Sequence, residues 1–441
     1  MKCTKSFAQG FSHAIGAMIA LVIVAAGPSL SAQTPRVIHE FNDTKGGNPV
    51  AQLVFDSSGN LYGTAQTGGR AKCTSDCGVV FKLYKSASGG WIEDVLHSFR
   101  GGKTDAGSPL AGVVFDGAGN MYGTTYGGGS SLCGGYGCGA VYELSPTITG
   151  GWTYSVIYAF SGGADGAQPL SQLVLDGSGN LYGTTLYGGA NDFGGVFELS
   201  HASGAWTEAV LYSFTGGSDG AEPYAGVVFD GSGNLYGTTW KGGLTGGICA
   251  SQGCGVVFEL SKSSGAWTES VLHTFSGGAD GAYSQASLTI DTHGNLYGVT
   301  GTGGVSGGCG GEGCGLVFEL SNSGGTWTET VLLTFQPGTS GFGGPGGANP
   351  YSGVTLDALG NLYGATHNGG VHGDGVVFEL SPPTTAGWTE TVLHSFNVIN
   401  GELPQSGVTL DGSGNLYGAA PYGGTGGYCG GSCGTIYEIT P

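Results

Sequence analysis

The chain has 441 residues, of which 95 are glycine and 15 are proline, so these two residue types make up about a quarter of the sequence. A fraction this high is typical of disordered chains when it has no period, but hydrophobic residues at 39% and aromatic residues at 11% are enough for a packed core. Twelve basic residues against 31 acidic ones give a formal net charge of −19. This acidic balance excludes nucleic acid and anionic membranes as expected partners, because both repel a negative surface.

The N-terminal segment has the order of a secretory signal peptide. Two lysines precede an apolar run at 14–26, and small residues ending at Ala32 follow it. The run is shorter than the ~20 residues that a membrane-spanning helix needs, so we expect no membrane span in the mature chain. The sequence therefore predicts a signal peptide at 1–32 and a single domain at 33–441. We expect the mature protein to be secreted or extracellular, with the periplasm as the alternative.

A repeat with a step of 54 to 66 residues runs through the mature chain. The phrase Leu-Tyr-Gly, once Met-Tyr-Gly, occurs seven times, each time after an Asp and a turn ending in Gly-Asn. One copy, at 226–275, shows four short apolar runs with alternating, β-branched and aromatic residues, separated by glycine-rich turns. This pattern predicts four strands per repeat, because Gly and Asn tolerate the backbone of a tight hairpin. Nothing in the mature chain has helical periodicity.

The two ends of the mature chain indicate how the repeats close. Residues 36–41 match a fourth strand without its first three, and residues 435–439 match a third strand without its fourth. The two fragments complete seven units of four strands, and their pairing removes the free edges of a ring. We therefore predict an all-β fold: a seven-bladed β-propeller of four-stranded blades, closed by the N-terminal strand pairing with the last blade.

The repeated phrases resemble a known bacterial family. Gly-Val-Val-Phe-Glu-Leu-Ser, Trp-Thr-Glu, Gly-Gly-x-Asp-Gly-Ala and Asp-Gly-Ser-Gly-Asn-Leu-Tyr-Gly-Thr-Thr are similar to the GloVer tandem repeat of choice-of-anchor proteins. The resemblance covers almost all of the mature chain and implies an exported repeat protein, but it implies no reaction and no catalytic residues. Members often end in a surface-sorting tail, whereas this chain stops at Pro441 directly after a strand. We therefore expect a soluble, secreted product.

Ten cysteines remain after the signal peptide, and they form five close pairs. Each pair lies between the second and third strands of its repeat, directly before a glycine. An even count at repeated positions of an exported chain predicts disulfides, each closing its own loop. A zinc site is the alternative, but it would need pairs from different loops to converge. The predicted disulfides are Cys73–Cys77, Cys133–Cys138, Cys249–Cys254, Cys309–Cys314 and Cys429–Cys433.

The two residues that follow each second strand are the most variable part of the repeat. If the first strand lines the channel, the second-to-third loops and the fourth-to-next-first loops share one side, which we call the loop face. Five of the seven variable pairs carry an aromatic or imidazole ring among glycines, which suits stacking on a sugar or holding a peptide. The alternative is that the rings only cover the loops. The candidate ligand-binding residues are Tyr126, Tyr187, Trp240, Lys241, His367, Asn368 and Tyr422.

Two other repeated groups have simpler explanations than a site. The loop aspartates could form a calcium site, but Asp before Gly also forms turns, which we favour; they are Asp165, Asp219 and Asp280. One histidine position is filled by Tyr or Leu in other copies, which favours packing over catalysis; its members are His39, His97, His273 and His394. No residue set breaks the repeat as a nucleophile, base and orienting group would. We expect no catalytic residue, no metal and no cofactor.

Three functional hypotheses follow from these features. The leading one is an exported, monomeric, non-enzymatic recognition or scaffold propeller that binds a carbohydrate or a protein on its loop face. The second is an extracellular polysaccharide lyase or glycoside hydrolase, for which the only local cluster is His367, His372 and Asp374. The third is a purely structural surface protein without a ligand.

Overall fold

The computed structural model describes residues 35–69, 77–202, 204–305, 307–338, 343–383, 387–425 and 433–440, all within the unit Gln33–Pro441. The predicted signal peptide and two predicted half-cystines, Cys73 and Cys429, lie outside these ranges. The described residues form seven four-stranded antiparallel sheets, one two-stranded ribbon and three short 3-10 turns. The predicted seven-bladed β-propeller is therefore confirmed.

Each blade contains four strands in repeat order. The first strands are β2 (Val54–Phe55), β7 (Val114–Phe115), β12 (Val174–Leu175), β16 (Val228–Phe229), β20 (Thr289–Ile290), β24 (Thr355–Leu356) and β28 (Thr409–Leu410). The second strands are β3 (Leu61–Ala65), β8 (Met121–Thr125), β13 (Leu181–Thr185), β17 (Leu235–Thr238), β21 (Leu296–Thr300), β25 (Leu362–Thr366) and β29 (Leu416–Ala420).

The third and fourth strands are longer than the first two in six of the seven blades; in blade 7 they have five residues each, as its second strand has. The third strands are β4 (Val79–Lys85), β10 (Ala140–Pro146), β14 (Gly195–Ala202), β18 (Val256–Ser263), β22 (Leu316–Ser323), β26 (Val376–Ser381) and β30 (Thr435–Ile439). The fourth strands are β5 (Trp91–Ser98), β11 (Trp152–Ala159), β15 (Ala205–Ser213), β19 (Ala266–Thr274), β23 (Thr326–Thr334), β27 (Thr389–Ser395) and β1 (Arg36–Glu40). A small ribbon of β6 (Ala106–Gly107) and β9 (Gly127–Gly128) is added in the second repeat.

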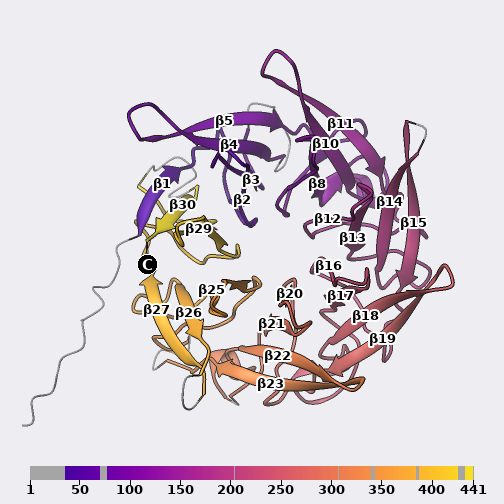
Figure 1. Cartoon of the computed structure of the whole chain (residues 1–441), viewed down its shortest axis with the longest axis vertical. Helices are drawn as coiled ribbons and strands as arrows, with labels where there is room; N and C mark the ends of the chain where they lie inside the picture. The colour runs from indigo at the N-terminus through magenta and orange to yellow at the C-terminus, as the bar shows by residue number, and fades with distance from the viewer. Residues whose placement is uncertain are drawn as a thin grey trace, which may run out of the picture. The chain divides into compact units, whose positions relative to one another are not determined.

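The blades are arranged around a common centre, and the first strand of each blade lies nearest to it. In Figure 1, β2, β16 and β20 lie towards the middle and β5, β19 and β23 at the periphery. We number the blades 1 to 7 in the order of their first strands, so blade 4 is β16–β19. Blade 7 has the strand order β28–β29–β30–β1, in which β1 pairs antiparallel with β30. The predicted closure by the N-terminal strand is confirmed.

The turn between the first and second strands is built around one aspartate per blade. In blade 3, Asp176 Oδ1 accepts the backbone N–H groups of Ser178 and Asn180, at 2.8 and 2.9 Å. Its Oδ2 accepts the Asn180 amide at 2.8 Å and the Tyr182 hydroxyl at 3.2 Å. These bonds outweigh the cost of burial and lower the pKa of Asp176. The Asp-Gly-Ser-Gly-Asn phrase is therefore a turn motif, as predicted.

The hydrophobic core lies between neighbouring blades. One cluster joins Val80 and Phe99 of blade 1 to Val113 and Tyr142 of blade 2, and each further cluster likewise joins two neighbours. A cluster also joins Ile436 of blade 7 to blade 1, so the packing continues across the closure. No helix within the described ranges is long and apolar enough to cross a membrane.

Candidate functional site

The loop face is held together by pairing between its two kinds of loop. The segment that enters each blade pairs with the second of the two variable residues after the second strand, as Ala221 does with Lys241 and Ala282 with Thr302. Equivalent bridges join 47 to 67, 167 to 187, 348 to 368 and 402 to 422, and the β6–β9 ribbon occupies this place in blade 2. The two loop types therefore share one side of the blades, as expected.

In the segment that enters each blade, one non-glycine residue has a left-handed backbone. Their φ angles lie between 52° and 58°, and the residues are Asn48, Ser108, Gln168, Glu222, Tyr283, Asn349 and Leu403. Six of them precede a proline, and Tyr283 precedes Ser284. Such a conformation costs roughly 1–3 kcal/mol per residue and persists only where the surroundings enforce it. The enforcing contacts come from the preceding blade.

Each left-handed residue connects the preceding blade to the variable residues of its own blade. Its N–H donates to a carbonyl at the end of the preceding second-to-third loop: Tyr283 N to Cys254 O at 2.9 Å, and Glu222 N to Phe193 O at 2.9 Å. Its own carbonyl accepts from the first variable residue, as Glu222 O does from Trp240 N at 3.1 Å. In blade 7 the corresponding residue is Pro421, which has no N–H to donate.

Three predicted disulfides are confirmed in these loops: Cys133–Cys138, Cys249–Cys254 and Cys309–Cys314. Cys77 and Cys433 are also disulfide-bonded, but their predicted partners lie outside the described residues, so those pairings stay predictions. The first cysteine of each confirmed pair belongs to a 3-10 turn, in η1 (Cys133–Gly135), η2 (Gly247–Cys249) and η3 (Cys309–Gly311). The loops are thus compact and closed.

An arc of aromatic rings crosses the loop face from blade 4 to blade 5. The rings of Tyr224 and Trp240, both in blade 4, have centroids 6.3 Å apart. Trp240 also contacts Tyr283 of blade 5, with centroids 6.0 Å apart and planes inclined by 54°. All three side chains are partly exposed. The predicted candidate Trp240 is therefore the middle of a group of three rings.

The arc continues towards blades 2 and 3. Burial raises the pKa of Tyr187, and the nearby Glu222 carboxylate and the hydroxyls of Tyr126 and Tyr224 raise it further. Burial and Tyr126 likewise raise the pKa of Tyr224. Tyr187 is 38% exposed. The structure thus brings together two more predicted candidates, Tyr126 and Tyr187; we call Tyr126, Tyr187, Tyr224, Trp240 and Tyr283 the aromatic arc.

Lys241 lies between a carboxylate and an aromatic ring. Its Nζ is 3.0 Å from Glu222 Oε2 and 3.1 Å from Oε1, and it stands 4.3 Å from the centroid of the Trp240 ring. The Lys241 and Glu222 side chains are only 17% and 13% exposed. The ion pair therefore neutralises both charges beside the arc and covers one side of the Trp240 ring.

The predicted candidates of blades 6 and 7, His367, Asn368 and Tyr422, lie outside the group of rings around Trp240. His367 contacts Tyr351 at a centroid distance of 5.2 Å, and its Nδ1 lies 3.2 Å from Leu403 O. Asn368 donates to Asn349 Oδ1 at 3.1 Å. Burial lowers the pKa of His367, so the ring is neutral at pH 7. These polar groups already bond to the protein, and Tyr422, at 38% exposure, lies beyond them in blade 7.

The three residues of the second functional hypothesis have different neighbours. His367 packs on Tyr351, whereas the exposed His372 lies near the outer-strand His394 and adds to the burial that lowers the pKa of His394 to about 4. Asp374 lies near Glu402. Across the described ranges, no three His, Cys, Asp or Glu side chains are arranged to hold a metal ion. Within the described ranges no hydrogen bond or ion pair joins His367, His372 and Asp374 to one another, so these contacts give a shared catalytic site no support.

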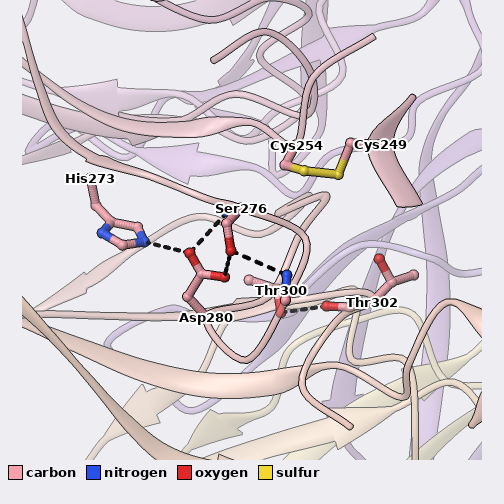
Figure 2. A network of polar contacts seen from close by, with 8 residues as sticks. Cys249, Cys254, His273, Ser276, Asp280, Thr300 and Thr302 are labelled. Atoms are coloured by element: carbon pink, nitrogen blue, oxygen red, sulfur yellow. Dashed lines mark hydrogen bonds and ion pairs between the residues drawn. A yellow bond between two sulfur atoms is a disulfide. The ribbon is translucent and has the colours of Figure 1, made fainter. Parts of the chain in front are cut away.

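A serine, an aspartate and a histidine occur together at the junction of blades 4 and 5 (Figure 2). Asp280 accepts the Ser276 hydroxyl and, at 2.9 Å, the Ser276 N–H, and its Oδ2 is 3.6 Å from His273 Nε2. Both partners therefore bond to the aspartate, whereas catalysis needs a serine bonded to the histidine. In blade 3, Tyr212 occupies the histidine position, 3.0 Å from Asp219. The group is a repeated turn.

The opposite side of the blades carries a small pocket between blades 6 and 7. Its lining includes Asp357, Tyr363, Leu410, Asp411 and Asn415. Both aspartates are the turn aspartates of their blades, each already accepting from its Asn and Tyr. Because every blade repeats these contacts, the pocket has no chemistry of its own.

Sequence comparison of the repeats missed three residues of the loop face: Tyr224, Tyr283 and Tyr351. All three lie in the segments that enter the blades. Tyr283 is itself a left-handed residue, and Tyr224 and Tyr351 each lie two positions after one. At the position two residues after the left-handed residue, the seven blades carry Val50, Leu110, Leu170, Tyr224, Gln285, Tyr351 and Gln405. This variation was a usable signal, but the contact of the segment with the variable pairs is visible only in three dimensions.

The family model of the Gloeobacter/Verrucomicrobia repeat matches residues 132–342 and 250–441. No curated protein matches the sequence. Among solved structures, a putative 6-phosphogluconolactonase from Bacteroides uniformis is 14% identical with a TM-score of 0.50, covering 80% of this chain and 86% of that one. An ulvan lyase is 13% identical with a TM-score of 0.45, covering 81% and 86%. At 14% identity the likeness to the lactonase shows the fold alone.

Proposed function

The chain belongs to the Gloeobacter/Verrucomicrobia repeat family, and from this premise we propose that it is an exported recognition propeller that binds a neutral glycan along the aromatic arc of its loop face. The observation that carries the proposal is the row of rings contributed by successive blades, with Trp240 in contact with both Tyr224 and Tyr283. Tyr and Trp combine a large apolar face with a polar group, which suits the alternating C–H and hydroxyl surface of a sugar.

Free hydrogen-bonding atoms beside the arc support a sugar ligand. Gln168 Oε1 in blade 3 and Thr302 Oγ1 in blade 5 are buried and have no hydrogen-bond partner among the described protein atoms. Buried polar atoms are normally paired, so these two oxygens would gain from a ligand hydroxyl once their side chains turn towards the surface. Both residues lie in the segments that form the loop face, one on each side of Trp240.

The charges around the arc favour a neutral ligand over an acidic one. Lys241, the cation that contacts the Trp240 ring, is neutralised by Glu222. The carboxylates of Asp192 and Glu312 lie near Tyr187 and Tyr283, and they add to the effect of burial in raising the pKa values of these two tyrosines. An acidic polysaccharide would meet net negative charge there.

Export is part of the same proposal. Disulfides persist in oxidising compartments and are rare in the cytosol. Three are present in the described loops, consistent with an extracellular location. The signal peptide, secretion and the monomeric state stay predictions, and cleavage near Ala32 is checked by N-terminal sequencing of the exported protein.

The test is an array of neutral glycans, acidic glycans and peptides, probed with the mature protein and two variants. We expect neutral glycans to bind, Trp240→Ala to weaken binding about tenfold or more, and Tyr136→Ala to bind like the wild type. Tyr136 is the matched control because it is a loop-face tyrosine outside the arc, 74% exposed. Binding of peptides alone, or equal losses in both variants, would contradict the proposal.

A further inference from the structure

The disulfide loop of blade 4 contains Trp240 and is hydrogen-bonded to Tyr283, the two residues whose rings are in contact. Trp240 lies near the start of the loop, separated from β17 by Thr239, and Cys254 lies near its end, before β18. The carbonyl of Cys254 accepts the N–H of Tyr283 at 2.9 Å. Tyr283 has a φ of 58°, so this bond helps to hold a conformation that the backbone otherwise avoids.

The disulfide also supports the segment that leads to Tyr283. Gly277 lies at the start of this segment, and a Cβ placed on it would be 2.9 Å from the sulfur atoms of both Cys249 and Cys254. The sulfur atoms thus pack directly on the Gly277 backbone. The disulfide of blade 2 packs in the same way on Gly162, with the corresponding distances at 2.6 and 2.9 Å.

Blade 3 shows what replaces a disulfide at this place. Its loop has no cysteine, and Phe193 lies at the position of Cys254, one residue before the glycine that precedes the third strand. The Phe193 ring is 2.6 Å from the corresponding Cβ position of Gly216, and its carbonyl accepts the N–H of the left-handed Glu222 at 2.9 Å. A phenyl ring and a disulfide therefore fill the same support position.

We propose that the Cys249–Cys254 disulfide is a positioning element of the ligand site: it packs on Gly277 and presents the Cys254 carbonyl, and thereby holds the Tyr283 ring against Trp240. Each loop of this kind then places the left-handed residue of the following blade. The disulfides of blades 2 and 5 hold Gln168 and Asn349 through the carbonyls of Cys138 and Cys314, both at 2.7 Å. The consequence for affinity rests on the proposed function, whereas the position of the rings does not.

Three double variants separate positioning from general stabilisation. C249A/C254A removes the disulfide of blade 4, and C309A/C314A removes the equivalent disulfide of blade 5. C249A/C254F places a phenylalanine at the position that Phe193 occupies in blade 3. The readout is the emission maximum of Trp240, obtained by subtracting the matching Trp240→Phe protein. We expect a shift to longer wavelength in C249A/C254A, no shift in C309A/C314A, and a return to the wild-type maximum in C249A/C254F.

Affinity for a neutral oligosaccharide from the array provides the second readout. We expect about a tenfold loss in C249A/C254A, a loss within about twofold in C309A/C314A, and recovery in C249A/C254F. Tyr283→Ala should lose the same amount, and adding it to C249A/C254A should cause no further loss, because both changes remove one contact. Circular dichroism confirms that each variant retains its sheet structure.

Unchanged Trp240 emission in C249A/C254A overturns the proposal, as does an equal shift in the blade 5 control. A C249A/C254F protein that stays shifted also overturns it, because blade 3 shows that phenylalanine gives the same support. If the wild type binds no glycan, the proposed function fails, and the emission measurements still decide whether the disulfide positions Tyr283.

Discussion

Glycine at residue 277 is required by two independent constraints, one from its backbone and one from its neighbours. Its φ is +79°, in the region where a side chain is strained, and both sulfur atoms of the blade 4 disulfide occupy the space of its missing Cβ. Gly231, in the turn on the opposite side of the same blade, has nothing within 4 Å of its Cβ position and no positive φ. The two glycines form a matched pair.

We expect Gly277→Ala to lower the free energy of unfolding by roughly 1–3 kcal/mol, because it adds backbone strain and a clash with the disulfide. Gly231→Ala should stay within about 0.5 kcal/mol of the wild type. Guanidinium denaturation of both variants measures the difference. Equal stability of the two variants would show that the packing of the disulfide on Gly277 is not tight.

At the scale of the strands, the fourth strand of blades 3 to 6 carries a half-buried glutamate at the junction with the preceding blade. These residues are Glu208, Glu269, Glu329 and Glu390. Burial raises the pKa of each to about 7, and for the first three the facing loop aspartate of the preceding blade adds to the rise. Tyr212 also faces Glu269, next to Asp219. The folded protein therefore holds protons there that the unfolded chain releases.

The sign of the pH dependence follows from these shifts. A carboxyl whose pKa is raised from 4.5 to about 7 stabilises the fold fully below pH 4.5, and this contribution is lost as pH rises through 7. Five turn aspartates have lowered pKa values and act oppositely, losing their contribution as pH falls through the acidic range; they are Asp56, Asp116, Asp176, Asp291 and Asp411. We expect the midpoint of thermal unfolding to be highest near ~pH 5 and to fall towards pH 8.

Glu269→Gln should flatten the decline between pH 5 and pH 8, because the amide remains neutral. Glu40→Gln is the control, since Glu40 is a more accessible carboxylate outside the blade 3 to 6 junctions, bonded to Thr425 at the surface. A midpoint that rises steadily from pH 5 to pH 8 in the wild type would contradict the assignment of the raised pKa values.

For the whole molecule, closure depends on one short strand at the N-terminal end of the propeller. β1 supplies the fourth strand of blade 7, and its removal leaves β30 as an unpaired edge beside exposed core residues such as Ile436. The exposed ion pair Arg36–Glu438, at 3.7 Å with Arg36 60% exposed, contributes little to this pairing.

We therefore expect deletion of residues 33–41 to give a protein that aggregates or unfolds at a clearly lower temperature, while Arg36→Ala behaves like the wild type. Differential scanning calorimetry and light scattering measure both. A peptide of residues 33–41 should restore part of the loss by adding the missing strand. A deleted protein with wild-type stability would show that the ring does not need this strand.

The repeat contained most of the information about the fold. The incomplete repeats at 36–41 and 435–439 predict the closure, and the short spacing of Cys249 and Cys254 predicts a local disulfide. Both features can be read directly from the order of residues along the chain. The aromatic arc was predicted only in part. Trp240 varies at a position that comparison of the repeats exposes, but its contact with Tyr283 joins segments of two blades. The left-handed backbone of Tyr283 and the Glu269–Asp219 proximity likewise depend on how neighbouring blades pack.

The most direct test of the central claim, that rings from successive blades form one glycan site, is calorimetric titration with neutral oligosaccharides of increasing length. The account predicts that affinity rises over the first several sugar units and then levels off, and that Tyr187→Ala and Tyr283→Ala each remove part of the rise while Tyr136→Ala removes none. Affinity independent of chain length, or the absence of saturable binding to any neutral glycan, would contradict it.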